Sequence, residues 1–316
     1  MTLELKIQNI EALKDLQAAG NPICLNYGVG VDSTAMLVAL WNHGVRPDLI
    51  LFSDTGGEKP ETYQYLDHIN AWLAEKNFPQ VTVVKYVPVR APYETLEGKC
   101  RANAGMPSLA TGGHSCALVF KVDVMDRWIA NWGPAKDAWA AGRHVIRLIG
   151  YDAGSRDSVR CAKFERLNDD EIEIPADDGT ELTKQAIKRA KSRRAQKEAE
   201  RRRFRFGFPL QMLGIDREQC KQLIKQACLE VPMKSACFFC PASTKKEVVW
   251  LRDTHPELYR RAVAMENEAL TGRHAQRRKA EGKPITTIGL GRKWTWASLA
   301  DATAANVDDQ EMAWRP

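Results

Sequence analysis

A glycine-bearing turn near the start of the chain constrains the fold more than any other feature of the sequence. Residues 22–25 have the apolar pattern of a short buried strand, and residues 33–41 have that of a helix. The turn between them reads Asn-Tyr-Gly-Val-Gly-Val-Asp-Ser, and its glycines permit a tight turn and a close approach to a ligand. We therefore expect the backbone N–H groups of residues 28–33 to face an anion at a helix N-terminus.

Two common nucleotide-binding loops do not fit this turn, because it has neither a Gly-Lys-Ser/Thr ending nor the third glycine of a dinucleotide fingerprint. The turn resembles instead the pyrophosphate loop, Ser-Gly-Gly-x-Asp-Ser, of the adenine nucleotide alpha-hydrolase superfamily, the PP-loop ATP pyrophosphatases. Gly30 takes the second family glycine and residues 31–33 fall in register, whereas Gly28 and Val29 stand where the family has serine and its first glycine. The alternative is an ordinary glycine turn between a strand and a helix.

Further segments resemble one branch of that superfamily, the PAPS reductase-like proteins of phages and mobile elements, and are also similar to DNA phosphorothioation sulfurtransferases. They follow one another in family order along most of the chain. The matching segments are residues 51–56 with 58–62, 115–116 with Lys121, 150–151, 208–210, 234–241, and 250–251 with Pro256. Such an ordered series is more specific than a single loop.

Alternating strand and helix patterns predict a doubly wound α/β core with a parallel sheet and crossover helices. The expected strands are residues 23–26, 49–53, 81–86 and 145–150, and the expected helices are residues 33–41, 61–76 and 122–132. The resemblance implies that this sheet is of the HUP, or adenine nucleotide alpha-hydrolase, type. Ligands of such sheets bind beyond the carboxyl ends of the strands, where the glycine turn, Asp54 and Gly150 are expected.

The later part of the chain predicts a helical C-terminal lobe, with helices at residues 217–229, 244–254 and 257–270. We therefore divide the chain into a nucleotide-binding α/β domain, residues 1–207, and a helical lobe, residues 208–316. The first contains a basic insertion at residues 184–205, and the second carries a Cys-x-x-Cys-Pro motif and the tail. Surface loops are expected at residues 88–113 and 152–178, and a docked strand or latch at residues 288–299.

Composition indicates a globular protein with reduced cysteines. Its 316 residues are 44% hydrophobic, which is enough for a large core. No apolar run is long enough to cross a bilayer, and residues 1–6 lack a basic segment followed by an apolar one. The eight cysteines have irregular spacing, which favours free thiols and metal or cluster ligands over a disulfide framework. We expect a cytoplasmic protein without a membrane partner.

Positive charge is concentrated in one block. Residues 184–205 carry eleven Lys and Arg residues against Glu198 and Glu200, although the net charge of the whole chain is only +6. The block has no apolar stripe before Phe204, which predicts a surface helix or arm. A nucleic acid is the expected partner, and the alternative is a solvated surface helix or a disordered insertion.

The resemblance also implies a nucleotide site, for ATP or PAPS with Mg²⁺. Asp32, as the family aspartate, is expected near the phosphates and Mg²⁺ as a catalytic residue, because Mg²⁺ favours carboxylate and phosphate oxygens; the alternative is that it caps the following helix. The expected nucleotide-binding residues are Tyr27, Gly28, Gly30, Val31, Asp32, Ser33, Asp54, Thr55, Gly150, Arg156 and Arg160. Residues 54–56 also suit an ordinary turn, and the two arginines also suit a solvated surface.

The motif at residues 237–241 is the second strong signal, because two thiolates separated by two residues converge readily on one metal or cluster. The resemblance adds further ligands and a catalytic Lys121, and it implies a [4Fe–4S] cluster, with zinc as the alternative. The expected ligands are Cys116, Cys220, Cys237 and Cys240, with Cys228 as a competing fourth ligand. Cys24, Cys100 and Cys161 are expected to be core or loop thiols, and the chain without any metal is the remaining alternative.

The chain has no cysteine after Cys240, whereas sulfonucleotide reductases use a tail cysteine as nucleophile. We therefore expect a PP-loop sulfurtransferase that uses ATP to activate a nucleic-acid oxygen for phosphorothioation- or thiolation-type sulfur transfer. A cysteine desulfurase or another sulfur donor would then be a partner. The alternatives are a PAPS or adenylyl-sulfate reductase and a non-catalytic nucleotide-sensing or nucleic-acid-binding module.

Overall fold

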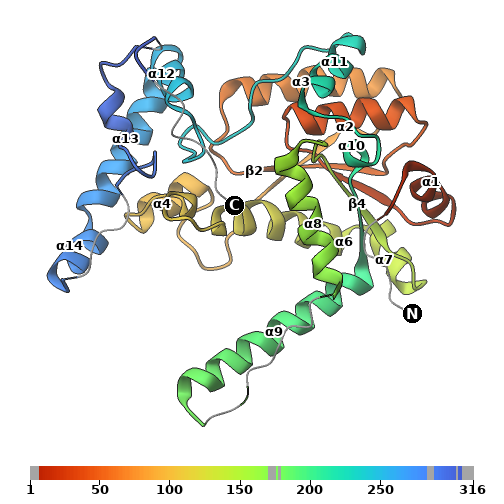
Figure 1. The fold of residues 1–316 in the computed structure, drawn as a ribbon, viewed down its shortest axis with the longest axis horizontal. Coiled ribbons are helices and arrows are strands. Elements are labelled where there is room, and N and C mark those ends of the chain that lie inside the picture. The colour runs from red at the N-terminus through yellow and green to blue at the C-terminus, as the bar shows by residue number, and fades with distance from the viewer. Residues whose placement is uncertain (1–6, 170–175, 177–178, 283–287, 304, 308–316) are drawn as a thin grey trace. The chain divides into compact units, whose positions relative to one another are not determined.

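The computed structural model describes residues 7–169, 176, 179–282, 288–303 and 305–307 (Figure 1). Its sheet has five parallel strands in the order β3-β2-β1-β4-β5. The strands are β1 (Ile23–Asn26), β2 (Leu49–Asp54), β3 (Val81–Lys85), β4 (Val145–Ile149) and β5 (Phe204–Gly207). The expected α/β class with a parallel sheet is confirmed, and its flanking helices are typical of a Rossmann-like fold.

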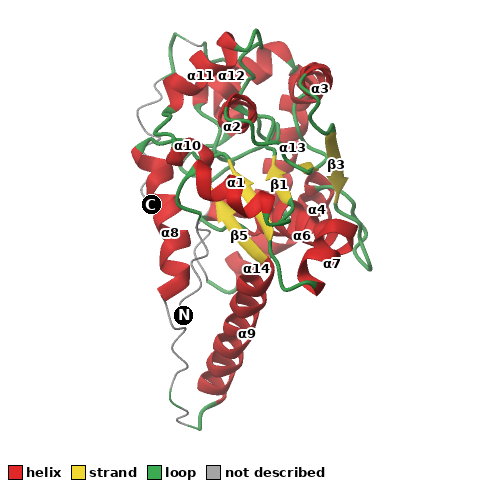
Figure 2. Cartoon of the chain, turned by 90° about the vertical axis from the view of Figure 1, so that its right-hand side faces the viewer, coloured by secondary structure: helices red, strands yellow, loops and turns green. Residues whose placement is uncertain are grey.

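Helices account for most of the remaining structure (Figure 2). They are α1 (Ile10–Ala18), α2 (Val31–Asn42), α3 (Pro60–Glu75), α4 (Leu96–Ala102), α5 (Ser115–Ala117), α6 (Asp123–Asn131), α7 (Gly133–Ala140), α8 (Ser155–Asp169), α9 (Glu181–Arg203), α10 (Pro209–Met212), α11 (Arg217–Gln226), α12 (Lys245–Thr254), α13 (Pro256–Thr271) and α14 (Arg273–Ala280), with shorter turns η1 (Ser108–Thr111), η2 (Leu118–Val122) and η3 (Trp296–Leu299). None of the described helices is both long and apolar enough to cross a membrane.

The chain divides into two compact units. Unit 1 comprises residues 1–52, 64–82 and 128–234, and unit 2 comprises residues 53–63, 83–127 and 235–316. Each has its own apolar core, which includes Leu25, Met36 and Leu148 in unit 1 and Phe120, Phe239 and Trp296 in unit 2. The expected domains, residues 1–207 and 208–316, stay a prediction.

In unit 1, the central strand β1 has parallel neighbours on both sides. Leu25 pairs with Ile50 of β2 and with Leu148 of β4, and all three side chains are fully buried. Helix α2 is buried around most of its circumference, which fits its apolar sequence and its packing against α10 and α11. The strand order therefore reverses between β1 and β4, and the loops that follow these two strands lie at the same edge of the sheet.

In unit 2, one buried carboxylate fixes the chain segment before and within η3. Glu266 of α13 is fully buried and accepts hydrogen bonds from the backbone N–H groups of Leu290, Trp296 and Ala297, at 2.6, 3.0 and 3.2 Å. Residues 288–299 thus dock as the expected latch, but as turns and a short 3₁₀ helix. The strand alternative for this segment was wrong.

Two of the expected loops contain helices. Residues 88–113 include α4 and η1, and residues 152–169 include the whole of the charged helix α8. The remainder of the expected 152–178 loop lies largely outside the described residues. Strand β5 was not predicted, because Arg205 interrupts its apolar pattern. Arg205 is nevertheless buried, and its guanidinium donates to the carbonyl oxygens of Arg201 and Phe204, both at 3.0 Å.

Candidate nucleotide and metal sites

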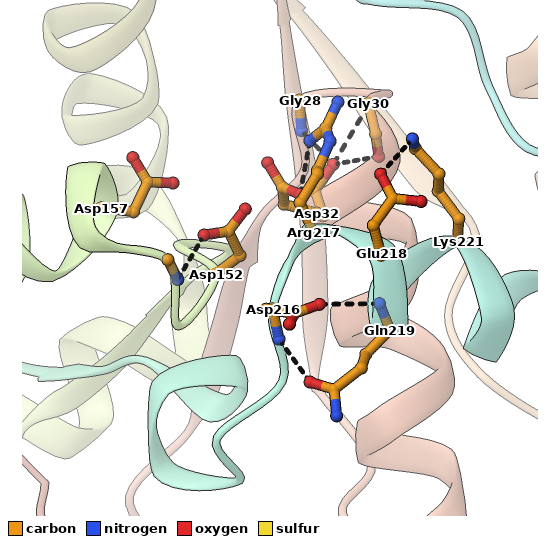
Figure 3. Close-up of polar contacts among 12 residues, drawn as sticks. Gly28, Gly30, Asp32, Asp152, Asp157, Asp216, Arg217, Glu218, Gln219 and Lys221 are labelled. Carbon is orange, nitrogen blue, oxygen red and sulfur yellow. Dashed lines mark hydrogen bonds and ion pairs between the residues drawn. The ribbon is translucent and has the colours of Figure 1, made fainter.

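The glycine turn of unit 1 connects β1 to the first turn of α2. The N–H groups of Gly28 and Gly30 both donate to the Ser33 hydroxyl at 3.2 Å, and that hydroxyl donates to the Gly30 carbonyl at 3.1 Å (Figure 3). The N–H groups of residues 31–33 have no acceptor within the helix, as is usual for a first turn, and no other acceptor among the described residues. These three N–H groups can therefore receive an anion.

Val29 takes a backbone conformation that favours glycine. Its φ is +57°, and its side chain is 1% exposed in the core of unit 1. A left-handed conformation is a genuine outlier for a β-branched residue, and Val29 stands where the resembling family has its first glycine. The loop thus keeps a glycine-type geometry at a residue that strains it.

Gly150, at the end of β4, packs directly against the same turn. A Cβ at this position would lie 2.9 Å from the backbone N and Cα of Ser33 and 3.1 Å from the Asp32 carbonyl carbon. Because these neighbours are backbone atoms, no side-chain movement can relieve the overlap. Gly150 therefore contributes to the site by allowing the two loops to approach each other.

Three carboxylates gather beside this turn. Asp32 in α2, Asp152 after β4 and Asp157 in α8 each offer an oxygen within 4.8 Å of the others. Arg217, the first residue of α11, donates to Asp32 at 2.5 Å (Figure 3). Arg160 donates to Asp157 at 2.9 Å. Three carboxylates at this separation repel one another unless a cation lies among them.

The electrostatics of Asp32 reflect this crowding. Burial raises the pKa of Asp32, Arg217 acts to lower it, and Asp152 and Asp157 raise it further, so that the pKa lies above its usual range. The carboxylate is thus less stable in its charged form than in water, and a nearby cation would reverse that tendency.

Several expected nucleotide-binding residues have other contacts in unit 1. The Tyr27 side chain is buried and its hydroxyl lies 3.0 Å from the Thr34 hydroxyl, so it faces the core. Arg156 is exposed on α8, and the Arg160 guanidinium lies 5.6 Å from the Tyr151 ring centre in addition to its pair with Asp157. Their roles toward a nucleotide stay predictions.

Sequence reasoning missed Asp152, Asp157 and Arg217. Asp152 follows Gly150 by two residues at the carboxyl end of β4, so the rule that ligands bind where the strand order reverses would have pointed to it. Asp157 lies in a segment that was expected to be a loop, and α8 brings it to the site. Arg217 reaches Asp32 from 185 positions away in sequence, and no local pattern indicates that pairing.

Asp54 and Thr55 belong to unit 2, where they enter a buried polar network. Asp54 accepts from the Gly56 N–H and the Tyr63 hydroxyl, both at 2.8 Å, and its second oxygen lies 3.3 Å from the Lys85 ammonium. The Thr55 hydroxyl lies 3.1 Å from the Cys237 sulfur. These contacts hold the start of unit 2 together, and a nucleotide contact from either residue stays a prediction.

Lys121, on the π-helical turn η2, lies among the cysteines of unit 2. Its ammonium is 3.7 Å from Glu58, whose side chain is fully buried. Burial acts to lower the pKa of Lys121, but Glu58 and then Cys237, Cys240 and Cys116 more than offset this, so its pKa is raised. The ammonium therefore stays charged beside three thiols. π-Helical turns of this kind often occur at functional sites.

The three cysteines near Lys121 come from two segments of unit 2. Cys237 is buried, whereas Cys116 and Cys240 are partly exposed and pack against the apolar core. Burial raises the pKa of Cys237, and Glu58 raises it further. No three cysteines in the described ranges have sulfur atoms within 4.8 Å of one another, whereas ligands of a single tetrahedral zinc lie about 3.8 Å apart.

Cys220 and Cys228 lie in unit 1. Cys220, on α11, is fully buried in the core; burial raises the pKa of its thiol to about 12, and Asp32 and Asp152 act in the same direction. Cys228 is exposed at a φ of +58° just after α11. Convergence of Cys220 with the three cysteines of unit 2 stays a prediction, as does Cys228 as its competitor. Cys24, Cys100 and Cys161 are buried.

Comparison of the sequence with models of known protein families finds no match, and comparison with curated proteins finds none either.

Proposed function

We propose that the protein binds ATP with Mg²⁺ at the glycine turn of unit 1 and adenylates an oxygen of a nucleic acid, which is then replaced by sulfur. One observation carries the proposal: unpaired N–H donors and three carboxylates meet where the loops after β1 and β4 approach each other. Backbone N–H donors bind phosphate oxygens, and carboxylates bind a hard cation. The donors and the carboxylates together therefore suit a polyphosphate that carries a metal ion.

We further infer a fold of the adenine nucleotide alpha-hydrolase type. The parallel sheet, the reversal of strand order between β1 and β4, and the glycine turn directly after β1 all support this inference. Open sheets with such a reversal bind nucleotides at the carboxyl ends of the strands beside it.

Mg²⁺ fits the donor set of unit 1, because three carboxylates supply the oxygen ligands that it prefers. Asp32, Asp152 and Asp157 would hold it, and when bound it would neutralise charge on the phosphates. The N–H groups of residues 31–33 would bind phosphate oxygens and offset negative charge on the departing pyrophosphate. Arg217 would orient Asp32 through their 2.5 Å contact.

In the reaction, the nucleic-acid oxygen forms a bond to the α-phosphorus of ATP. The bond from that phosphorus to the bridging oxygen breaks, and pyrophosphate leaves with the electron pair. A hydrosulfide equivalent from a sulfur donor then attacks the activated substrate atom, a new bond to sulfur forms, and AMP leaves with the original oxygen. Both steps conserve oxidation state when the donor delivers sulfur at the level of sulfide. A persulfide donor would first take two electrons from a thiol reductant, which releases the hydrosulfide.

We favour a [4Fe–4S] cluster over zinc at the unit 2 cysteines, since no three cysteine sulfurs of the described residues lie within 4.8 Å of one another, as the ligands of a single tetrahedral ion would. Cys116, Cys237 and Cys240 would hold it, and it would accept or relay sulfur when bound. Lys121 supports this fit, since its ammonium would offset the negative charge that three thiolates bring to a partly buried position.

A nucleotide-sensing role is the second candidate. Val29 takes a left-handed backbone conformation that glycine would take without strain. In addition, the N–H groups of Gly28 and Gly30 already donate to the Ser33 hydroxyl, so they are not free for a phosphate. Such a loop would bind ATP without turning it over. Pyrophosphate release separates the two candidates.

The test measures pyrophosphate release from ATP by the full-length protein, prepared anaerobically, with Mg²⁺, a sulfur donor and either duplex or single-stranded nucleic acid. We expect release that depends on Mg²⁺ and nucleic acid, and a loss of at least about 100-fold in Asp32→Asn. Asp67→Asn, which removes an exposed carboxylate from α3, is the matched control and should keep full activity.

ATP binding without any pyrophosphate release would favour the sensing role. Equal pyrophosphate release by Asp32→Asn and the wild type would show that the glycine turn is not the Mg²⁺–ATP site.

A further inference from the structure

Helix α9 is a long extension of unit 1. Its 23 residues span about 34 Å at 1.5 Å per residue, and Figures 1 and 2 both show it running away from the sheet of that unit. The helix begins at Thr180, whose hydroxyl accepts from the Thr183 N–H at 3.2 Å. Residues 184–203 of the block that the sequence predicted as a surface helix or arm thus form a regular helix, whereas Phe204 and Arg205 begin β5 and are buried.

The C-terminal end of α9 is anchored to unit 1. The indole N–H of Trp139 donates to the Arg203 carbonyl at 2.8 Å, and the Arg203 guanidinium lies 5.1 Å from the Trp139 ring centre. Trp139 also packs edge-on against Phe204 at 5.9 Å. These contacts fix the base of the helix, so the basic segment at residues 184–194 is held at a defined position outside the core.

That segment carries positive charge on several sides. Between residues 184 and 194 the sequence has six Lys and Arg residues and no acidic residue. Lys188, Arg189 and Arg194 are exposed and have no acidic partner among the described residues. At about 100° per residue, these three side chains leave the helix in three directions separated by roughly 100–140°.

The composition of α9 disfavours two other anionic partners, single-stranded nucleic acid and a membrane. It has no aromatic residue between Glu181 and Arg203, so it offers no platform on which single-stranded bases could stack. Its few apolar residues do not form one face, whereas a helix that lies on a membrane needs an apolar face. What remains is attraction between phosphates and charges that point to several sides.

We propose that residues 184–194 of α9 cross the major groove of duplex DNA and contact the phosphates of both strands. A helix with side chains is 10–12 Å across, and the B-form major groove is about 12 Å wide, so phosphates flank such a helix on two sides. The major groove of duplex RNA is deep and narrow, which disfavours this mode. Contacts of this kind position a duplex without reading its sequence. That this duplex is the substrate rests on the proposed function.

The experiment measures binding of fluorescent 30-base-pair DNA, duplex RNA of the same length and the matching DNA single strand by anisotropy, without ATP, over a range of salt concentrations. The arm variant replaces Lys184, Lys188, Arg189, Lys191 and Arg194 by Gln, a residue that preserves helix propensity. The control replaces five exposed basic residues elsewhere by Gln: Arg90, Lys136, Lys225, Arg277 and Lys279. Each variant lowers the net charge from +6 to +1, so the two differ in where the charge is lost.

We expect the wild type to bind duplex DNA more tightly than single-stranded DNA or duplex RNA. In the arm variant, duplex affinity at 0.1 M salt should fall at least about tenfold, and the slope of log affinity against log salt should become shallower by about four, because up to five phosphate contacts are lost. The control should stay within about twofold of the wild type. Circular dichroism should show equal helix content in all three proteins.

Equal duplex affinity of the arm variant and the wild type would overturn the proposal. So would an equal loss in the control, tighter binding of single-stranded DNA than of duplex, or arm-dependent binding of anionic lipid vesicles in place of duplex DNA. Failure of the proposed function looks different: duplex binding would then depend on the arm while ATP is neither bound nor cleaved. Conversely, Asp32→Asn should retain duplex binding.

Discussion

Two carboxylates, the partly buried Asp32 in unit 1 and the buried Glu97 in unit 2, both accept hydrogen bonds from arginine, yet their pKa values move in opposite directions. Burial acts to raise both. Glu97 is paired with Arg261 and, at 3.0 Å, with Arg101, and these pairs bring its pKa below the usual range. Asp32 has only Arg217 and lies among other carboxylates, so its pKa is raised.

The opposite pKa shifts distinguish a carboxylate whose charge the protein itself balances from one that, on our account, binds a ligand. Around Glu97 the chain supplies enough positive charge of its own, and the carboxylate links α4 to α13 without further help. Around Asp32 it leaves an excess of negative charge beside unpaired N–H donors, which is a costly arrangement unless a ligand balances it. The same residue chemistry therefore serves stability in unit 2 and, on our account, nucleotide binding in unit 1.

The largest effect is expected from a substitution that distorts the site in unit 1 without changing any charge. Gly150→Ala places a Cβ 2.9 Å from the Ser33 backbone, so the two loops must separate. We expect a loss of about 1–3 kcal/mol in the free energy of unfolding and a weakening of Mg²⁺–ATP binding by up to about 100-fold, because a misplacement of roughly 1 Å can have that effect. Chemical denaturation and equilibrium dialysis measure the two quantities.

Gly133→Ala is the matched control, since a Cβ at that position meets no other atom within 4 Å. It should leave Mg²⁺–ATP binding unchanged and should keep or slightly raise the free energy of unfolding, because alanine favours a helix over glycine. Normal ATP binding by Gly150→Ala would show that the close approach of the two loops is irrelevant to the nucleotide.

The next effect concerns unit 2. Glu97→Gln removes the charge shared by Arg101 and Arg261. We expect the free energy of unfolding to fall by about 1–3 kcal/mol, the range for hydrogen bonds to charged groups, because the carboxylate is buried but both arginines are partly exposed. ATP binding should not change. Glu94→Gln, at an exposed position three residues earlier, should have no effect on stability. If Glu97→Gln lost ATP binding and kept its stability, the claim that Glu97 serves stability and Asp32 serves nucleotide binding would be wrong.

A smaller effect tests the strained turn. Val29→Ala and Val29→Gly both remove a buried apolar side chain, but only glycine relieves the left-handed backbone. The glycine variant should therefore be more stable than the alanine variant by about 1 kcal/mol. At Val38, which is equally buried within α2, the order should reverse by a similar amount, because glycine disfavours a helix. The same order at both positions would mean that Val29 is not strained.

The smallest effect is in pH dependence, measured by denaturation with Mg²⁺ chelated. The folded pKa of Asp32 is raised above 3.8. The contribution of Asp32 to stability therefore falls as pH increases from 3.8 to the folded pKa, and Asp32→Asn should gain stability relative to the wild type over this pH range. Glu97 has a lowered folded pKa, so its contribution is present above about 4.5 and is lost as pH falls further. Parallel pH profiles for Asp32→Asn and Glu97→Gln would contradict the comparison.

The sequence predicted those parts of the fold that depend on local patterns. The strands around Leu25 and Leu148 and the turn into α2 follow from apolar runs and glycines. Helix α8 was missed because its charged sequence resembles a loop, and β5 because Arg205 is buried by hydrogen bonds to nearby carbonyl groups. Such compensation depends on the tertiary structure and leaves no periodic signal.

The candidate site divides in the same way. Asp32, Ser33 and Gly150 could be found from a loop pattern and a resemblance, but Asp157 and Arg217 reach the site only through the placement of α8 and α11. The thiol pattern predicted which cysteines would hold a metal or cluster, and that assignment stays a prediction. It did not indicate that Cys220 is fully buried in the core of unit 1, close enough to Asp32 for that carboxylate to affect the pKa of the thiol.

The most direct test of the central claim is the Mg²⁺ dependence of ATP binding, measured by equilibrium dialysis with either Mg²⁺ or EDTA for wild type, Asp32→Asn and the control Asp67→Asn. We predict that wild type and Asp67→Asn bind ATP at least about tenfold more tightly with Mg²⁺, and that Asp32→Asn loses this gain while it keeps weak binding through the N–H groups of residues 31–33. An equal gain from Mg²⁺ in Asp32→Asn, or no ATP binding by the wild type, would contradict the claim.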